Sequence, residues 1–444
     1  MASRPSSPGR RDSWRRSSLK AMERDVGIEG YLTSTPGVGG TTKASADDFI
    51  VEEVSSPPPK SAGGPYAIAT IRVRNWETNR LVREFARALH ISRRRIGFAG
   101  TKDKRALTTR LFSFENVPVE TLSSLRMKDL EVLDAYPSDR PLEIGDLTGN
   151  RFRVLVRGLA VPVEKAEVIV AETARQLRIR GGFANFFGVQ RFGSVRPITH
   201  VVGRHIVRGE FREAVDAYVA NPIPGEGPES YGVRAALRDT GDVPAALRAY
   251  PKSYGFEKAI LNHLATHPDD AVGALRQLPF NLLLMFVHGY QSYLFNRILS
   301  ERMRRGLPIH EPVAGDLVLP ADKRGLPDRD RTIDVTCDNL ERVAGRCHEG
   351  KAWVSAILFG SEPEFAGGEP GQIEKEVVAS EGLQPNDFII PDIPRISSRG
   401  TRREILAPIR DLEAAIVGDD LHLSVELTRG AYATSLVREF TKSE

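Results

Sequence analysis

The chain has 444 residues, of which 41% are hydrophobic and 27% are charged, an ordinary composition for a globular protein with room for about two or three domains. It contains no run of about eighteen apolar residues and no apolar leader at the N-terminus, so we expect neither a membrane span nor a secretory signal. Its two cysteines, Cys337 and Cys347, cannot build a disulfide framework, and we expect a reduced, cytoplasmic setting.

Charge is distributed unevenly along the chain. The net charge of +4 includes +5 from residues 1–20, where six Lys and Arg face Asp12, so the remainder sums to −1 (4 − 5). Residues 72–110 hold twelve Lys and Arg against three acidic residues, a net of +9 (12 − 3). A concentrated basic segment in a near-neutral chain is typical of a nucleic-acid-binding protein.

The N-terminal part begins with an irregular segment and continues into strands. Residues 1–26 are rich in Ser, Arg and Pro and lack apolar periodicity, which predicts a disordered basic arm. The glycine-rich run 36–43 is not a phosphate-binding loop, because no Gly-Lys-Ser/Thr ends it at the required spacing. Residues 48–54 and 66–74 have the apolar and polar patterning of strands.

A helix is predicted next, with Thr78 or Asn79 as its N-cap and apolar residues recurring at helical spacing as far as Leu89. Arg83 and Arg87 recur on another face of the same helix. This face is either a stripe that contacts phosphates or an ordinary solvated helix face, and the sequence leaves both interpretations open.

The segment 95–110, RIGFAGTKDKRALTTR, gives the strongest indication of chemistry. An apolar run leads into a turn at Gly100 and a β-rich pattern resumes after it, which predicts a strand, a turn and a second strand. The turn presents Asp103 between two lysines, and nearby cations favour the ionised form of a carboxylate. Such a group suits nucleophilic attack better than proton donation. The alternative is a charged turn without a catalytic role.

The rest of the chain changes character twice. Strands are predicted near 108–116, 130–136, 150–157 and 421–427, and helices at 162–181 and 280–305. Short helices separated by loops such as 221–230 dominate from Phe183 onward, and the C-terminal part returns to strand patterns. A helical middle between strand-rich ends predicts an α+β fold with one domain inserted into another.

Other chemistries have weaker support. His263 and His267 lie four residues apart, a spacing that could bind zinc, but no third ligand is evident and no metal site is expected. The chain lacks GxSxG, HExxH and GxGxxG motifs. Glu52 and Glu53 could partner Asp103, although an exposed strand charge is the simpler interpretation.

Eight blocks of sequence, taken in order, resemble one known family. The blocks are 43–53 (KASADDFIVEE), 74–83 (RNWETNRLVR), 97–105 (GFAGTKDKR), 149–153 (GNRFR), 186–193 (FFGVQRFG), 290–296 (YQSYLFN), 397–403 (SSRGTRR) and 430–442 (GAYATSLVREFTK). Over nearly its full length after residue 26, the chain resembles the TruD family of tRNA pseudouridine synthases in its archaeal form. The arm has no family counterpart, and Ala46 stands where the family often has Pro.

The resemblance implies a role for four residues at the reaction centre. Asp103 matches the catalytic aspartate of the family, and Lys43 matches its basic partner. Asn150 and Phe152 match the pair that orients the aspartate and stacks on the target base. Whether Asp103 acts as a nucleophile or as a base stays open at this stage.

The resemblance also implies the pocket and the domains. Phe49 and Phe440 match two further aromatic positions that line the uridine pocket. The implied fold is an α+β catalytic domain with a mixed or antiparallel sheet, formed by residues 27–183 together with 405–444. It is interrupted by the inserted, helix-rich TRUD domain at 184–404.

The implied activity is isomerisation of uridine to pseudouridine in tRNA, at position 13, by a monomer. The reaction carries no group and oxidises nothing, so no cofactor or metal is required. The basic residues expected to contact RNA are Arg83, Arg87, Arg94, Lys102, Lys104 and Arg105. Two alternatives remain open: a non-catalytic RNA-binding or chaperone protein on the same fold, and another base-acting enzyme such as a nucleosidase.

Overall fold

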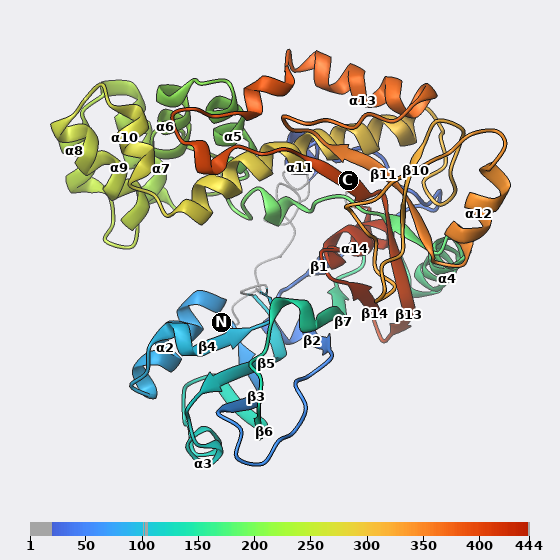
Figure 1. Ribbon diagram of the computed structural model, residues 1–444, viewed down its shortest axis with the longest axis horizontal. Coiled ribbons are helices and arrows are strands. Elements are labelled where there is room, and N and C mark those ends of the chain that lie inside the picture. The colour runs from blue at the N-terminus through green and yellow to red at the C-terminus, as the bar shows by residue number, and fades with distance from the viewer. Residues whose placement is uncertain (1–19, 101, 103–104, 443–444) are drawn as a thin grey trace, which may run out of the picture. The chain divides into compact units, whose positions relative to one another are not determined.

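The structure is a computed structural model that describes residues 20–100, 102 and 105–442 (Figure 1). The chain divides into two compact units. The helical unit comprises the described part of Met1–Leu32 together with Ala184–Leu406, and the sheet unit comprises Thr33–Phe183 together with Ala407–Glu444. The segment Ala184–Leu406 therefore interrupts the sheet unit in the chain, and the predicted α+β fold class is confirmed.

The sheet unit is built on one mixed sheet. Its strands are β1 (Thr41–Thr42), β2 (Phe49–Ser55), β3 (Tyr66–Arg74), β4 (Ile96–Phe98), β5 (Leu107–Glu115), β6 (Leu130–Ser138), β7 (Leu147–Arg157), β8 (Gly182–Ala184), β13 (Leu406–Val417) and β14 (Asp420–Thr428). Their order is β6-β3-β5-β2-β7-β14-β13-β8, with β1 beside β7 and β4 beside β5. β2 and β5 run parallel, whereas β2, β7, β14 and β13 pair antiparallel in succession.

One face of this sheet is buried along its central strands. On β7, Phe152 and Val154 are buried whereas Arg151 and Arg153 are exposed, as the two-residue period of a strand requires. The antiparallel register sets Val51 on β2 opposite Phe152. Side chains directly opposite each other point to the same face, so the inward face of β7 continues onto β2.

Helices complete the sheet unit and its core. They are α2 (Thr78–Ala88), α3 (Val119–Ser123), α4 (Val163–Ile179) and α14 (Ala433–Thr441). Phe85 of α2 meets Phe112 and Phe114 of β5 edge-on, with ring centroids 5.2 and 5.3 Å apart. These rings belong to a cluster of buried apolar residues drawn from α2, β3 and β5. The start of α2 lies beside the segment that follows β4, because the Thr78 hydroxyl accepts a hydrogen bond from the Lys102 amide.

The predicted N-cap of α2 is wrong by one or two residues. The Glu77 carboxylate caps the helix, accepting hydrogen bonds from the amides of Asn79 and Arg80, each at 2.8 Å. A carboxylate can also interact favourably with the positive end of the helix dipole. Thr78 is instead the first helical residue, and its buried hydroxyl accepts hydrogen bonds from the Lys102 amide and from Arg110.

The helical unit packs short helices against one long helix and a small sheet (Figure 1). Its helices are α5 (Thr199–Val207), α6 (Phe211–Val219), α7 (Pro228–Thr240), α8 (Val243–Ala249), α9 (Gly255–Thr266), α10 (Ala271–Arg276), α11 (Phe280–Arg304), α12 (Leu340–His348) and α13 (Gly368–Ser380). Its strands are β9 (Leu317–Pro320), β10 (Ile333–Asp334), β11 (Ala352–Leu358) and β12 (Thr401–Glu404), in the order β10-β9-β11-β12. The long helix predicted at 280–305 is confirmed as α11.

The predicted arm ends earlier than residue 26. Residues 20–25 are helical, and Val26 is fully buried, with its carbonyl accepting a 2.9 Å hydrogen bond from the side-chain amide of Asn296. A buried apolar side chain and a buried backbone hydrogen bond both oppose disorder. The disordered assignment was therefore wrong for this end of the arm, and residues 1–19 lie outside the described part of the chain.

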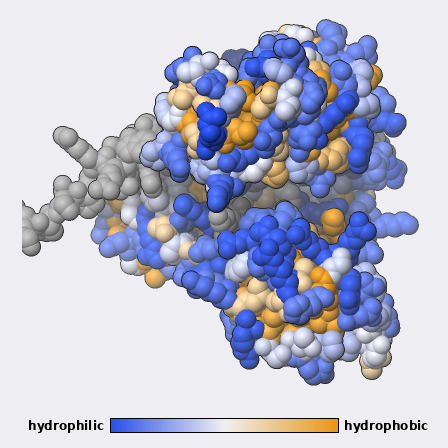
Figure 2. Space-filling view, turned by 90° about the vertical axis from the view of Figure 1, so that its left-hand side faces the viewer, coloured by the Kyte–Doolittle hydropathy of each residue, from blue (hydrophilic) through white to orange (hydrophobic). Residues whose placement is uncertain are grey.

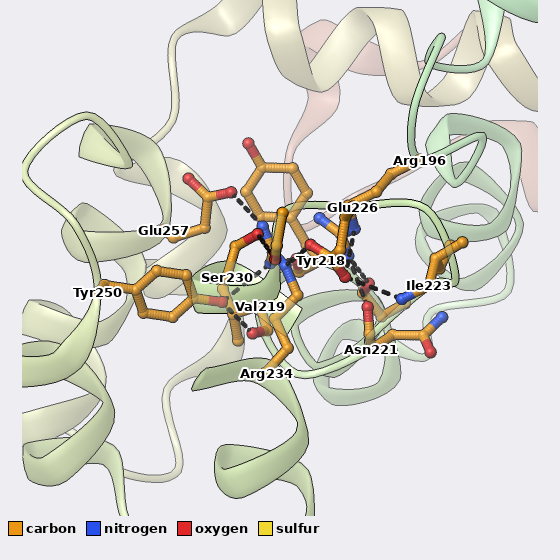
Figure 3. Close-up of polar contacts among 12 residues, drawn as sticks. Arg196, Tyr218, Val219, Asn221, Ile223, Glu226, Ser230, Arg234, Tyr250 and Glu257 are labelled. Atoms are coloured by element: carbon orange, nitrogen blue, oxygen red, sulfur yellow. Dashed lines mark hydrogen bonds and ion pairs between the residues drawn. The ribbon is translucent and has the colours of Figure 1, made fainter. Parts of the chain in front are cut away.

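A buried polar network fixes the loop before α7 in the helical unit (Figure 3). The Arg234 guanidinium forms ion pairs with Glu226 at 3.0 Å and Glu257 at 2.9 Å. It also donates to the Tyr218 carbonyl and to the Tyr250 hydroxyl. The side chains of Arg234 and Glu226 are 1% and 3% exposed and point toward each other, so the network is structural (Figure 3).

The molecular face drawn in Figure 2 is mostly hydrophilic, with apolar areas limited to separate patches. Within the described residues, none of the helices combines the length and the apolar character that crossing a bilayer would need.

Candidate active site

Two of the expected site residues, Asp103 and Lys104, lie outside the residues that the structure describes. The site is therefore built from the residues around them. All the other candidates belong to the sheet unit, and four of them lie on β2, on β7 or just before β2.

Lys43, Phe49 and Phe152 form one contiguous group. The Lys43 ammonium lies 3.9 Å from the centroid of the Phe49 ring, and the Phe49 and Phe152 rings meet edge-on at 5.9 Å. A cation over an aromatic face is worth about 0.5–2 kcal/mol, depending on how dry the contact is. Phe49 and Phe152 are both buried, so this contact is sheltered at least on its aromatic side.

The backbone at Lys43 is in an uncommon conformation. Lys43 follows β1 and has a φ of +58°, in the left-handed region that non-glycine residues rarely adopt. Such a conformation costs about 1–3 kcal/mol, and where it persists it often marks a functional position. Two residues separate Lys43 from the 3₁₀ turn η1 (Ala46–Asp48), which leads into Phe49.

Asn150 lies two residues before Phe152 on β7 and on the same face of the strand. It is paired with Glu53 on β2 and with Leu427 on β14. Within the described part of the chain, its buried Oδ1 accepts no hydrogen bond. An unsatisfied buried acceptor costs about 1–3 kcal/mol, so Oδ1 is available to a donor that enters this face of the sheet.

The structure does not bring Phe440 into this aromatic pair. Phe440 lies on α14 and is fully buried, and its carbonyl accepts a 2.9 Å hydrogen bond from the Val38 amide. Among the described residues, no ring–ring contact joins it to Phe49 or Phe152. Its implied place in the uridine pocket therefore stays a prediction.

Lys102 was expected to contact RNA, but its ammonium is directed inward. It lies 2.9 Å from Glu53 Oε1, with 6% of the lysine side chain and 2% of the glutamate side chain exposed. Burial lowers the pKa of Lys102, and the Glu53 carboxylate opposes that effect. In this arrangement Lys102 is not presented to a phosphate at the surface.

The other basic candidates gather at the surface. Arg83 and Arg87 of α2, with Arg93 and Arg94 after it, line an open pocket of about 590 Å³, which we call the arginine pocket. Glu84 forms an ion pair with Arg87 at 3.1 Å and approaches Arg83 at 3.7 Å. Four arginines against one glutamate leave this surface strongly positive. Arg105, in the loop before β5, is also exposed.

Sequence reasoning missed three buried polar side chains beside the segment that follows β4. Glu53 pairs with Lys102, and Arg110 donates a hydrogen bond to the Thr78 hydroxyl. The two-residue strand period could have revealed two of them. Glu53 points to the same side of β2 as the buried Phe49 and Val51. Arg110 points to the same side of β5 as its buried neighbours two residues away. A charged residue on the buried side of a strand indicates a buried ion pair rather than a solvent-exposed charge.

A metal centre has no support among the described residues. No group of three or more His, Cys, Asp or Glu side chains is placed to hold an ion. His263 and His267 stack with ring centroids 4.9 Å apart, and His263 Nε2 lies 2.7 Å from Asp270. An imidazole paired with a carboxylate and stacked on a second ring is accounted for without a metal.

Known proteins resemble the chain over almost its whole length. The family model for tRNA pseudouridine synthase D (TruD) matches residues 25–440. A protein named probable tRNA pseudouridine synthase D from Methanococcoides burtonii is 40% identical over 430 residues, covering 95% of this chain and 98% of that protein. One of the same name from Natronomonas pharaonis is 41% identical over 436 residues, covering 95% and 98%.

A solved structure agrees with the sequence matches. A crystal structure described as tRNA pseudouridine synthase D (TruD) from Methanosarcina mazei superposes with a TM-score of 0.82 at 40% identity, covering 95% of this chain and 98% of that one. The fold and the sequence together define the chain as an α+β isomerase of the pseudouridine synthase class. It belongs to the TruD family of tRNA pseudouridine synthases.

Proposed function

We propose that the chain isomerises uridine to pseudouridine in tRNA, at position 13, with Asp103 as the essential carboxylate. The observation that carries the proposal is the cluster of Lys43, Phe49, Asn150 and Phe152 on one face of the sheet, in a chain that belongs to this family over nearly its full length. In this proposal the sheet unit is the catalytic domain and the helical unit is the inserted TRUD domain. A monomeric state and a cytoplasmic location stay predictions.

The proposed reaction needs few groups from the protein. The bond between C1′ of the ribose and N1 of uracil breaks, the base turns, and C1′ forms a bond with C5. The proton on C5 leaves, and N1 gains a proton, so the product has the composition of the substrate. One carboxylate, acting on the sugar or on the base, and a pocket that holds the detached uracil are sufficient.

The aromatic pair fits a pocket for an unstacked base. Taking a base out of its stack costs a few kcal/mol, and an aromatic face can return about 1–3 kcal/mol. Phe152 would supply that face, while the edge-on contact with Phe49 holds its ring. Oδ1 of Asn150, which accepts no hydrogen bond from the described residues, would then accept one from a group that arrives beside the base.

The arginine pocket would supply phosphate contacts. Arg83, Arg87 and Arg94 lie on the surface of the same unit as the proposed catalytic residues, and guanidinium groups bind phosphate oxygens in a fixed geometry. We propose that these residues, with Lys104 and Arg105, position the tRNA. Lys102 is left out of this set because its ammonium is buried against Glu53.

The test uses a tRNA transcript that carries tritium at C5 of uridine. Formation of the C1′–C5 bond expels this label into water, so tritium release by the purified protein measures the reaction. We expect release by the wild type and none above background for Asp103→Asn, whereas Asp239→Asn, a control at an exposed carboxylate of the helical unit, keeps the wild-type rate. Absence of release by the wild type would refute the proposal, and free uracil as the product would favour a nucleosidase.

A further inference from the structure

A cluster of three buried charges lies on the inward face of the sheet. Val51 of β2 lies beside Thr108 of β5 in the parallel register, so Glu53 and Arg110, two residues further along each strand, share that face. Lys102 completes the cluster through its 2.9 Å ion pair with Glu53. Arg110 is 2% exposed, like the Glu53 side chain. Charges so well shielded from water are screened little by salt.

The same cluster holds the backbone that leads into the KDK segment 102–104. The Thr78 hydroxyl accepts hydrogen bonds from the Lys102 amide at 3.3 Å and from Arg110 Nη1 at 3.0 Å. Arg110 Nη1 also reaches the Gly100 carbonyl at 3.5 Å. The chain is therefore fixed at residues 100 and 102 by side chains from α2 and β5.

Glu53 has two separate attachments. Its Oε1 faces the Lys102 ammonium, and its Oε2 accepts a 3.0 Å hydrogen bond from the Leu111 amide of β5. The hydrogen bond from the Leu111 amide holds the carboxylate against the sheet. The ion pair then holds the Lys102 ammonium beside that carboxylate. Glu53 is also the cross-strand neighbour of Asn150, so the carboxylate lies next to the implied orienting residue.

The charge balance of the cluster depends on this one carboxylate. Burial lowers the pKa of Lys102 and the neighbouring Arg110 cation lowers it further, whereas Glu53 raises it. Burial also lowers the pKa of Arg110 to about 10, against the influence of Glu53 and Glu77. Glu53 is therefore the group in direct contact that favours the charged form of Lys102.

We propose that Glu53 is a positioning residue for the reaction: its buried ion pair with Lys102 fixes the chain one residue before Asp103 and so sets where the essential carboxylate can lie. Lys102 is anchored both at its amide and at its ammonium, and successive Cα atoms are about 3.8 Å apart, so the chain continues toward Asp103 from a fixed point. The inference rests on the proposed function, because it assigns Glu53 a role only if Asp103 carries the reaction.

The first test compares two neighbouring glutamates. Glu53→Gln keeps the size of the side chain and an acceptor for the Leu111 amide, but it removes the charge. Glu52→Gln is the matched control, because Glu52 lies on the opposite face of β2, is 33% exposed, and pairs with Arg153. A misplacement of about 1 Å can cost about 100-fold in rate, so we expect a loss of about that size for Glu53→Gln in single-turnover experiments at saturating tRNA. Glu52→Gln should keep the wild-type rate.

The pH dependence separates positioning from a general loss of structure. The groups that face one another here are Glu53, Lys102 and Arg110, with Glu77 acting on Arg110. As the pH rises and Lys102 loses its proton, the wild type also loses the ion pair. The ratio of the wild-type rate to the Glu53→Gln rate should therefore fall toward one on the alkaline side. A merely structural role would leave that ratio constant with pH.

Lys102→Met provides a second variant if Glu53→Gln fails to fold. Because the two residues act as a pair, the double variant should be no slower than the slower single variant. Multiplied losses in the double variant, or an equal rate for Glu53→Gln and Glu52→Gln, would overturn the inference. An inactive wild type would refute the proposed function instead, so the two failures can be told apart.

Discussion

Replacing Phe152 with Leu tests the proposed base-stacking face. Leucine keeps an apolar side chain on the inward face of β7 but offers no aromatic ring to a base or to Phe49. We expect the single-turnover rate at saturating tRNA to fall, while whole-tRNA affinity changes within about threefold, because many phosphate contacts dominate that affinity.

The magnitude follows from the contacts of the ring. One stacked base is worth about 1–3 kcal/mol, which corresponds to a rate loss of about 5- to 160-fold if stacking supports the transition state. Phe152 is buried, so its replacement also disturbs packing, and conserving apolar volume limits that cost to about 1.5 kcal/mol. Truncation to alanine would add the cost of a cavity and obscure the result.

Phe114→Leu is the control for this experiment. Phe114 is fully buried on β5 and meets Phe85 edge-on at 5.3 Å, in the apolar core rather than in the candidate site. Tritium release and urea unfolding, measured for both variants, separate rate from stability. The reasoning is refuted if Phe114→Leu slows the reaction as much as Phe152→Leu, or if Phe152→Leu lowers tRNA affinity strongly at an unchanged rate.

Two further predictions concern charge. Replacing Arg83, Arg87 and Arg94 by Gln should flatten the slope of log K against log salt by about 2–3, the share of three phosphate contacts, and an unchanged slope in filter binding would show that the arginine pocket does not touch RNA. Asp48→Asn should lower the free energy of unfolding by about 1.5–3 kcal/mol at pH 7, because the buried Asp48 carboxylate accepts 2.8 and 3.0 Å hydrogen bonds from Arg157. Arg157 holds the pKa of Asp48 below 3.8, so the stabilisation is present above that value and is lost as the pH falls through the lowered pKa. Urea unfolding should therefore show the gap between the two proteins closing in acid, and a gap that persists there would contradict this account.

Local patterns predicted much of the sheet unit. The alternation in 66–74 gives β3 with its observed bounds, and the helix placed after Pro162 corresponds to α4. Both signals depend on short-range periodicity, which a single sequence shows directly. The N-cap of α2 was missed because Glu77, Thr78 and Asn79 can all cap a helix, and the choice depends on the partners of Thr78.

The candidate site depends on contacts that periodicity does not reveal. Lys102 was expected at the surface because two neighbouring charges in a turn are usually solvated. Its buried partner, Glu53, is 49 residues away in the chain (102 − 53), and only the parallel pairing of β2 with β5 brings the two together. The sequence patterns alone could not supply that pairing, since parallel neighbours are set by the topology of the whole sheet.

The measurement that tests the central claim most directly is the mapping of pseudouridine in a tRNA transcript treated with the purified protein. Carbodiimide adducts that remain on pseudouridine stop primer extension and so locate the product. We predict one new stop, at position 13, for the wild type and for Glu52→Gln, and no stop for Asp103→Asn. The account is contradicted if the wild type produces no pseudouridine, or if Asp103→Asn produces the same stop at a comparable rate.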